Sequence, residues 1–398
     1  MQIFDIVGDV AGKNILLFQG PMGDFFNVLD KKFVAHGATT FRIGLNAGDQ
    51  FFADARHFSP YKGTLHDWKK YIKEYLQSYW IDMIFVFGDC RIYQKQAIEI
   101  AKKLGIKVFV FEEGYIRPDF ITLEENGVND NSSLPRECQF YDALGYDETK
   151  ICNSKNVVHI GNTYKKMAIQ AIIYYIVANL FSFRYPHYQH HRNFSSLTEA
   201  VYGIKNYFRK NLFKILEYGK EKIYQKKLSK QYYFVALQTF EDFQISHHSD
   251  YNSIEEFILE VLESFCIHAP KESYIVFKHH PMDRGKKNYK RLIQNYAEKK
   301  GCAQRVKVVY DLHLPTLLKN AIATVTINST VGISSLYHQT PTICMGRSFY
   351  DIEGLTSKGV ALDKFWKEYK EVDQELFNKF RCYLIEKTQI NGSFYKTL

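Results

Sequence analysis

Short apolar runs alternate with longer amphipathic stretches twice along this chain, once within residues 1–125 and again within residues 232–327. The first series predicts strands at 15–18, 40–43, 83–87 and 107–111, with helices at 25–36, 65–78 and 93–104. The second predicts strands at 232–237, 274–278, 306–309 and 323–327, with helices at 254–269, 289–300 and 314–320. Strands that alternate with helices in this way favour a parallel, doubly wound sheet, which binds ligands at the carboxyl ends of its strands.

Residues 163–230 break this alternation, because they have a helical period, many Lys, Tyr and Phe residues and few strand signals. We therefore expect an α/β protein with a GT-B-like pair of Rossmann-type, doubly wound domains and an inserted helical region. The predicted divisions are an N-terminal domain at 1–162, the helical region at 163–230, a C-terminal domain at 231–357 and a helical tail at 358–398. The tail could return to the N-terminal domain.

The helical region contains an uncharged stretch, residues 167–183, which is at the short limit for a membrane span and is interrupted by Gln170 and Asn179. We expect a buried or interfacial helix there. Residues 202–231 mix aromatic side chains with Lys and Arg at helical spacing, as interfacial amphipathic helices do. The alternative is a solvated basic face whose aromatic residues pack on the protein itself.

The formal net charge is +9, from 52 Lys and Arg against 43 Asp and Glu, which favours an anionic partner. Charge alone does not separate nucleic acid, an anionic membrane and an acidic substrate. The seven cysteines have no metal-ligand spacing, and the first residues do not resemble a signal peptide. We therefore expect free thiols in a reducing cytoplasm.

Several familiar motifs are absent from the sequence: the GxGxxG fingerprint, the GxxxxGK[ST] loop, the GxSxG elbow and HExxH. Asp-x-Asp is absent too, which disfavours sugar transferases that hold a diphosphate through a metal ion. We expect neither a bound metal nor a cofactor.

Two segments in the second series could hold an anion. Lys278-His279-His280-Pro281 follows a predicted strand and supplies a cation and two imidazoles, although such a string is also common in structural loops. A loop of small residues at 328–335 opens a predicted helix, where free N–H groups attract anions or where Ser and Thr simply cap the helix. Together they favour a phosphate site.

Carboxylates follow strands in both series. Asp242 comes four residues after Gln238, and Glu112-Glu113-Gly114 ends a strand of the first series, so Asp242 and Glu113 could face each other across an interdomain cleft. Glycosyl transfer uses such a pair as nucleophile or base and as acid. The ordinary alternative is that both are solvated loop residues.

These segments resemble the bacterial capsule polysaccharide synthesis and export family, the KpsS type of β-Kdo glycosyltransferase that is related to KpsC. In the first series the resemblance rests on segments 19–26, 46–49, 88–91 and 111–118. In the second it rests on segments 238–242, 278–281, 329–332, 349–351 and 354–356. Their order along the chain is more specific than any one string.

The resemblance implies a retaining, metal-independent transferase that moves Kdo from CMP-Kdo to lysophosphatidylglycerol through a covalent adduct and starts the linker of a capsular polysaccharide. It also implies a peripheral position on the cytoplasmic face of the inner membrane. Partners would be CMP-Kdo, the lipid acceptor, the anionic membrane surface and, in addition, other capsule synthesis and export proteins. Nucleic acid is not expected.

By motif position, the resemblance makes the N-terminal domain the acceptor domain and the C-terminal one the CMP-sugar donor domain, with Asp242 as nucleophile and Glu113 as the acidic residue near the acceptor. The implied donor-binding residues are Gln238, Lys278, His280, Pro281, Asn328, Ser329, Thr330 and Val331. The implied acceptor or cleft residues are Gly20, Pro21, Gly23, Asp89, Arg91, Gly114 and Arg117.

Two other functions fit the same residues. One is a GT-B transferase that uses another nucleotide sugar or a polyol phosphate for a wall polymer. The other is a non-catalytic capsule export component that binds polymer or lipid. The carboxylates and the anion loops favour an enzyme.

Overall fold

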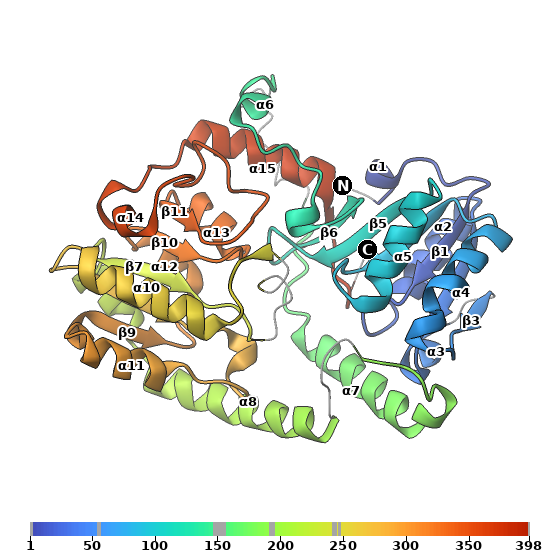
Figure 1. The fold of residues 1–398 in the computed structure, drawn as a ribbon, viewed down its shortest axis with the longest axis horizontal. Coiled ribbons are helices and arrows are strands. Elements are labelled where there is room, and N and C mark those ends of the chain that lie inside the picture. Colours follow the sequence, from blue (N-terminus) through green and yellow to red (C-terminus); the bar gives the residue numbers. More distant parts are fainter. Residues whose placement is uncertain are drawn as a thin grey trace. The chain divides into compact units, whose positions relative to one another are not determined.

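The computed structural model describes residues 3–53, 57–145, 157–190, 196–240, 245 and 248–396. The chain divides into two compact units, each built around its own sheet (Figure 1). Unit 1 comprises Met1–Leu134, Cys152–Ser196 and Cys382–Leu398, and unit 2 comprises Pro135–Ile151 and Leu197–Arg381. The predicted region 163–230 is thus shared between the units, and the end of the chain lies in unit 1. The finer domain boundaries stay predictions.

The sheet of unit 1 has the strand order β12-β6-β5-β4-β1-β2-β3. Five parallel strands form most of it: β1 (Asn14–Phe18), β2 (Thr39–Gly44), β3 (Phe58–Pro60), β4 (Met83–Phe87) and β5 (Lys107–Glu113). The antiparallel strand β6 (Phe120–Glu125) pairs with β5, and β12 (Gln389–Asn391) pairs antiparallel with β6. The last strand of the chain therefore completes the sheet that the first strand begins.

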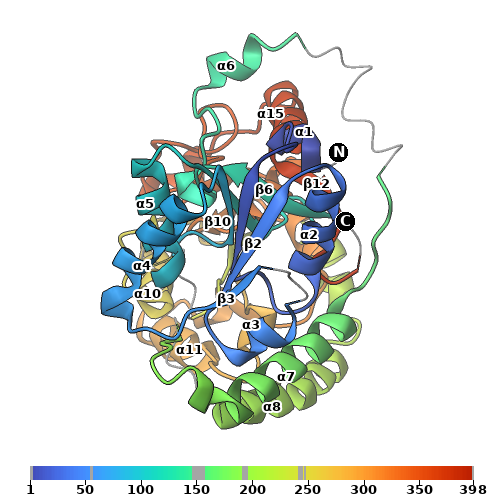
Figure 2. The ribbon, with the colours of Figure 1, turned by 90° about the vertical axis from the view of Figure 1, so that its right-hand side faces the viewer.

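Strand β1 shows why this sheet is covered on both faces. Its alternate residues enter two different cores: Leu16 and Phe18 pack with α4 (Leu65–Ser78) and α5 (Ile92–Lys103), whereas Ile15 and Leu17 pack with α1 (Ile3–Val7) and α2 (Phe25–Ala35). Figure 2 shows these helix pairs on opposite sides of the strands. A continuous apolar run is what a doubly covered parallel strand requires.

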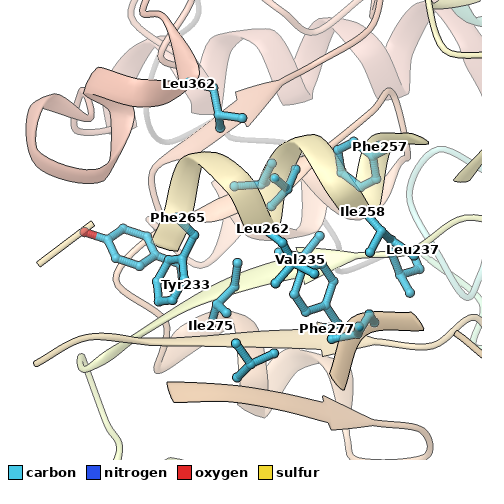
Figure 3. Packing of buried hydrophobic residues seen from close by; sticks show 14 of the residues in the cluster. Tyr233, Val235, Leu237, Phe257, Ile258, Leu262, Phe265, Ile275, Phe277 and Leu362 are labelled. Carbon is cyan, nitrogen blue, oxygen red and sulfur yellow. The ribbon is translucent and has the colours of Figure 1, made fainter. Parts of the chain in front are cut away.

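Unit 2 has a wholly parallel sheet with the order β11-β10-β7-β8-β9. Its strands are β7 (Tyr232–Ala236), β8 (Tyr274–Lys278), β9 (Val306–Val309), β10 (Thr324–Thr326) and β11 (Thr342–Cys344). On one face, α10 (Ile254–His268) packs Ile258, Leu262 and Phe265 against Val235 and Ile275 (Figure 3). Further helices described in this unit include α6 (Cys138–Asp142), α11 (Lys290–Lys299), α12 (Leu314–Lys319), α13 (Val331–Tyr337), α14 (Leu362–Glu368) and the first half of α15 (Gln374–Thr388).

The predicted fold class is confirmed. The protein is α/β, with two Rossmann-type, doubly wound sheets as in GT-B-like proteins. All eight predicted strands are present, with ends that shift by one or two residues. The sequence analysis missed short elements, namely α1, α3 (Ala47–Phe51), α6 (Cys138–Asp142), β3, β6, β11 and β12. These elements have few residues, and β12 in addition depends on pairing with β6, which lies far away in the sequence.

The helical region forms α7 (Tyr164–Leu180) in unit 1 and α8 (Ser196–Leu216), nearly all of it in unit 2, followed by a π-helical turn at Ile223–Lys227. Helix α7 lies beside α3 in both ribbon views (Figures 1 and 2). None of the helices in the described part of the chain is long and apolar enough to cross a bilayer.

Cys266, at the end of α10, and Cys302, before β9, form a disulfide in unit 2. The expectation that all seven cysteines are free thiols is therefore wrong for this pair. The two positions are 36 residues apart in sequence, so spacing could not identify them.

Glu217 fixes the end of α8 to unit 2. Its buried carboxylate accepts hydrogen bonds from the backbone N–H groups of Tyr310, at 2.8 Å, and Asp311, at 2.7 Å. Among the residues that the structure describes, neither N–H group has another hydrogen-bond acceptor, so the contact is a structural anchor.

We predict that Glu217→Ala lowers the free energy of unfolding of unit 2 by about 2–4 kcal/mol, because two buried donors lose their acceptor. Urea unfolding followed by circular dichroism measures this. The matched control is Glu221→Ala, which removes an exposed acceptor of the His313 N–H and should have an effect below about 1 kcal/mol. Equal effects of the two variants would contradict the anchor.

Candidate functional site

Each sheet has one point where the order of its strands reverses. In unit 1 the chain forms β1, β2 and β3 in one direction and then crosses to β4 on the other side of β1. In unit 2 it forms β7, β8 and β9 and then crosses to β10 on the other side of β7. A crevice opens outside the carboxyl ends of the strands at such a point, which is where open α/β sheets bind ligands.

A pocket of about 160 Å³ lies at the reversal point of unit 1. The loop after β1 and the end of β4 form part of it, and α7, the following segment and the C-terminus contribute aromatic walls. Its lining residues are Gln19, Gly20, Pro21, Met22, Phe87, Arg91, Tyr174, Tyr175, Tyr188, His190 and Tyr395. The Arg91 guanidinium carbon lies 4.8 Å from the centre of the Phe87 ring, so the pocket combines a cation with aromatic surfaces.

A buried polar network supports this pocket. Gln19 has a positive φ of 37°, and its side chain donates to Asp49 at 3.2 Å and accepts from Gln94 at 2.9 Å. Asp49 also accepts from the Tyr174 hydroxyl, at 2.8 Å, and from a backbone N–H. Burial raises the pKa of the Asp49 carboxyl, while these hydrogen bonds and nearby Arg42 oppose the shift. The network holds the unusual backbone of Gln19 in place.

The structure brings three of the predicted acceptor residues together, because Gly20, Pro21 and Arg91 line this one pocket. Gly23 lies next to it at φ +125°, and a Cβ atom there would stand 2.5 Å from the Gln170 side chain of α7. Glycine is therefore required for the close approach of the loop to α7.

Other predicted acceptor residues have structural contacts of their own. Asp89 is buried and accepts from the Val128 N–H at 3.0 Å and from the Asn131 side chain at 3.1 Å. At Gly114 a Cβ atom would lie 2.0 Å from the Phe120 carbonyl oxygen, so only glycine fits. The exposed side chain of Arg117 donates to the Gly114 carbonyl at 3.2 Å. Among the described residues, none of these three lines the pocket.

The two glutamates that end β5 differ in environment. Glu113 is exposed, whereas Glu112 accepts the Glu113 N–H at 2.9 Å and has its pKa raised to about 7, chiefly by burial. Tyr395 of the pocket lies within electrostatic range of Glu113 and Arg91. The predicted acid, Glu113, is thus near the pocket but does not line it.

Side-chain bonds tie three loops of unit 2 together at its reversal point. Gln238, after β7, donates to the Asn328 side chain at 3.0 Å and accepts the Asn328 N–H at 3.2 Å. Asp283, after β8, accepts the Phe240 N–H at 3.0 Å. The loops after β8 and β10 thus flank the loop after β7. Asp242, the predicted nucleophile, lies outside the described residues.

The Lys278-His279-His280 run combines a cation with two different imidazoles. Lys278 donates to the Tyr310 carbonyl at 2.7 Å, and burial lowers its pKa to about 8. His279 stacks between the rings of Tyr289 and Tyr310, and burial lowers its pKa to about 4, so it is neutral and structural. His280 accepts the Met282 N–H on Nδ1, ahead of the short turn that Pro281 begins.

The loop after β10 is shaped by its own contacts. The Ser329 hydroxyl accepts the Val331 N–H at 3.2 Å, and the Tyr350 hydroxyl donates to the Ser329 carbonyl. Thr330 occupies the N-cap position of α13 but makes no side-chain capping bond. Ser329, Thr330 and Val331 are all partly exposed, so this loop is accessible.

The sequence analysis missed the aromatic walls of the unit 1 pocket. Tyr174, Tyr175, Tyr188 and Tyr395 come from segments far from β1, and no local pattern connects them with it. Across the described residues, no group of three or more His, Cys, Asp or Glu side chains could hold a metal ion. The absence of a metal requirement stays a prediction.

Glu112 gives unit 1 a pH dependence whose sign follows from its pKa. The unfolded carboxyl ionises near pH 4.5 and the folded one near 7, so the folded state holds the extra proton between these values. Stability contributed by this group is therefore lost as the pH rises from about 4.5 to 7.

We predict that Glu112→Gln raises the free energy of unfolding of unit 1 by about 2 kcal/mol at pH 8 and changes it little at pH 4.5. The amide keeps the acceptor for the Glu113 N–H and removes the charge. Scanning calorimetry at the two pH values measures the difference. Glu113→Gln, at the exposed neighbour, is the control and should change the free energy of unfolding little at either pH. If Glu112→Gln gave the same gain at both pH values, ionisation of Glu112 would not be its cause.

Comparison with known proteins gives three curated relatives that match nearly the whole chain, including the following two. The capsule polysaccharide export protein KpsS of Escherichia coli is 41% identical over 386 residues, which cover 97% of this chain and 98% of the relative. The capsule polysaccharide modification protein LipB of Neisseria meningitidis serogroup B is 38% identical over 406 aligned positions, which cover 97% and 92%.

A solved structure described as the β-Kdo 2,7 transferase of Thermosulfurimonas dismutans KpsC is similar at 14% identity, with a TM-score of 0.41, over 92% of this chain and 89% of that one. A family model described as capsule polysaccharide biosynthesis protein matches residues 82–395. The resemblance inferred from the motifs is confirmed by this match and by the two curated relatives. The chain belongs to the capsule polysaccharide biosynthesis protein family.

Proposed function

We propose that this protein is a retaining β-Kdo glycosyltransferase that transfers Kdo from CMP-Kdo to lysophosphatidylglycerol and so starts the linker of a capsular polysaccharide. The observation that carries the proposal is that each unit of this member of the capsule family has a candidate binding site of its own. Unit 2 has Lys278 and His280 at the end of β8 and the hydroxyl groups of Ser329 and Thr330 after β10, and unit 1 has a pocket with an arginine and tyrosines at its reversal point.

Unit 2 would bind the donor. CMP-Kdo presents a phosphate and a sugar carboxylate, both anions, and Lys278 with a pKa near 8 keeps most of its positive charge at pH 7. His280 and the hydroxyl groups of Ser329 and Thr330 would donate hydrogen bonds to the nucleotide. Cations that already stand in place stabilise the departing phosphate without a metal ion.

The proposed reaction has two displacements. The Asp242 carboxylate attacks the anomeric carbon of Kdo, and the bond to the CMP phosphate breaks with its electron pair leaving on CMP. An acceptor hydroxyl then attacks the same carbon, Asp242 leaves, and Glu113 takes the hydroxyl proton. Two inversions give net retention.

Unit 1 would bind the acceptor. A phosphoglycerol headgroup needs a cation for its phosphate and hydrogen-bonding groups for its hydroxyls, and Arg91, Gln19 and the pocket tyrosines are of these kinds. The pocket volume, about 160 Å³, suits a headgroup of this size and not a long polymer.

Helix α8 supports a peripheral position on the inner face of the cytoplasmic membrane. Its exposed apolar side chains include Ile204, Phe208 and Ile215, and exposed lysines such as Lys205 and Lys214 lie among them. Such a surface combines apolar contact with attraction to anionic lipid, about 1 kcal/mol for each basic residue.

The decisive test incubates the purified protein with CMP-Kdo and lysophosphatidylglycerol, with EDTA present, and determines the mass and anomeric configuration of the product. We predict a β-linked Kdo lipid from the wild type and none from Asp242→Ala, because the nucleophile is lost. The affinity of Asp242→Ala for CMP should stay close to that of the wild type. Glu241→Ala is the matched control; if it abolishes transfer while Asp242→Ala does not, the assignment of the nucleophile is wrong.

We predict that His280→Ala weakens CMP binding about tenfold or more, because a charge-assisted hydrogen bond contributes about 1.5–3 kcal/mol. Isothermal calorimetry with CMP measures this, with UDP as a comparison ligand. His313→Ala is the control, since His313 is an exposed histidine of the same unit, at the N-cap position of α12, and is not among the proposed donor-binding residues. Unchanged CMP affinity in His280→Ala would remove this residue from the site.

A further inference from the structure

Helix α7 of unit 1 has exposed apolar side chains on one face and buried polar side chains on the other. Its apolar side chains face outward, where Ile169 and Ile172 are each 59% exposed and Leu180 is 67% exposed; Ile173 and Ile176 lie on the same face. Its buried side chains include the polar residues Gln170 and Tyr174. A surface helix in water normally turns its apolar stripe to the core.

Specific hydrogen bonds fix this orientation. The Gln170 amide donates to Asp24 at 2.9 Å, and the Tyr174 hydroxyl donates to Asp49 at 2.8 Å and accepts from Asn46 at 2.7 Å. Rotating the helix to bury its isoleucines would break all three bonds and leave buried polar groups without partners. The outward apolar face is therefore part of the folded structure of unit 1.

The surroundings of this face favour an anionic lipid surface as its occupant. Exposed cations flank it at both ends, Lys165 and Lys166 at the start and Arg184 after the end, and residues 164–184 include neither Asp nor Glu. Exposed aromatic residues, Tyr164 and Phe183, stand at the two ends. Apolar side chains bounded by aromatic and basic residues are the composition of helices that lie in a membrane interface.

The helix would lie along the surface and not cross it. Its inner face is bonded to Asp24, Asn46 and Asp49, so lipid cannot surround it. The same helix forms part of the pocket wall, because Tyr174, on the inner face, and the neighbouring Tyr175 are lining residues. Tyr175 is one turn from Ile172, so the pocket wall continues directly into the apolar face.

We propose that the outer face of α7 inserts among the acyl chains of an anionic membrane leaflet, and that the pocket behind it receives the phosphate headgroup of a lipid from that leaflet, with the phosphate on Arg91. That this lipid is the acceptor of the sugar rests on the function proposed above. The inference adds that the acyl chain is recognised by α7.

The first experiment tests insertion without any need for catalysis. Two of the three tryptophans, Trp68 and Trp366, are fully buried, and the exposed one, Trp80, is replaced in the background W80F. In this background, the emission that Ile176→Trp adds to that of the two buried tryptophans should be quenched at least about twofold by anionic vesicles whose lipids carry bromine in their acyl chains. Ile267→Trp, at an exposed apolar position of unit 2, is the control and should not be quenched.

The second experiment tests recognition of the acyl chain. In the double variant Ile172→Ser with Ile176→Ser, the KM for a long-chain lysophospholipid acceptor should rise about tenfold or more, because apolar contact with the chain is lost. The increase should be confined to long-chain acceptors, with CMP affinity unchanged. Ile267→Ser is the matched control and should behave as the wild type does.

The outcomes separate the two proposals. The inference is supported by quenching at position 176 together with a rise in KM that is confined to long-chain acceptors. If the wild type transfers no sugar, the proposed function fails, while quenching still decides whether α7 inserts. Absence of quenching at position 176 overturns the inference, and a protein partner would then be the occupant of this face. An equal rise in KM for short and long chains also overturns the recognition of the chain by α7.

Discussion

A hydrogen bond between two amide side chains spans the reversal point of each sheet, and both candidate sites depend on it. In unit 1, Gln94 after β4 donates to Gln19 after β1; in unit 2, Gln238 after β7 donates to Asn328 after β10. A parallel sheet necessarily opens a crevice where its chain changes direction. The amide pairs fix the two walls of that crevice at a set separation, so that the loops beyond them can present groups to a ligand.

The parts of this fold that the sequence predicts are those with a local signal. Strand β1 is a continuous apolar run, and α4 has an apolar stripe at helical spacing, so each was recognisable alone. Strand β12 has three residues within a tail of helical pattern, and pairing with β6, some 270 residues earlier, makes it a strand. A pattern within one segment has no information about a partner so far away.

The candidate site residues show the same distinction between what a local pattern predicts and what depends on distant contacts. Polar motifs at strand ends were located correctly, but their sequence does not say whether a side chain faces a ligand or the protein. Asp89, after β4, accepts hydrogen bonds from residues that follow β6, and His279 is stacked between two tyrosines, although both stand beside residues that remain accessible. Their roles follow from burial and from bond partners, which arise only when separate loops meet.

The orientation of α7 shows the largest difference between composition and structure. The uncharged stretch at 167–183 is equally compatible with a buried, interfacial or inverted helix, because the average hydropathy of a helix contains no information about direction. Gln170 and Tyr174 are four residues apart, on one face, and the acceptors they find on unit 1 decide which face turns inward. The apolar surface and the wall of the pocket consequently belong to one helix. Under the proposed insertion of α7, a lipid that left the bilayer along that helix would reach the pocket without exposing its whole acyl chain to water, so the cost of hydrating that chain would be reduced.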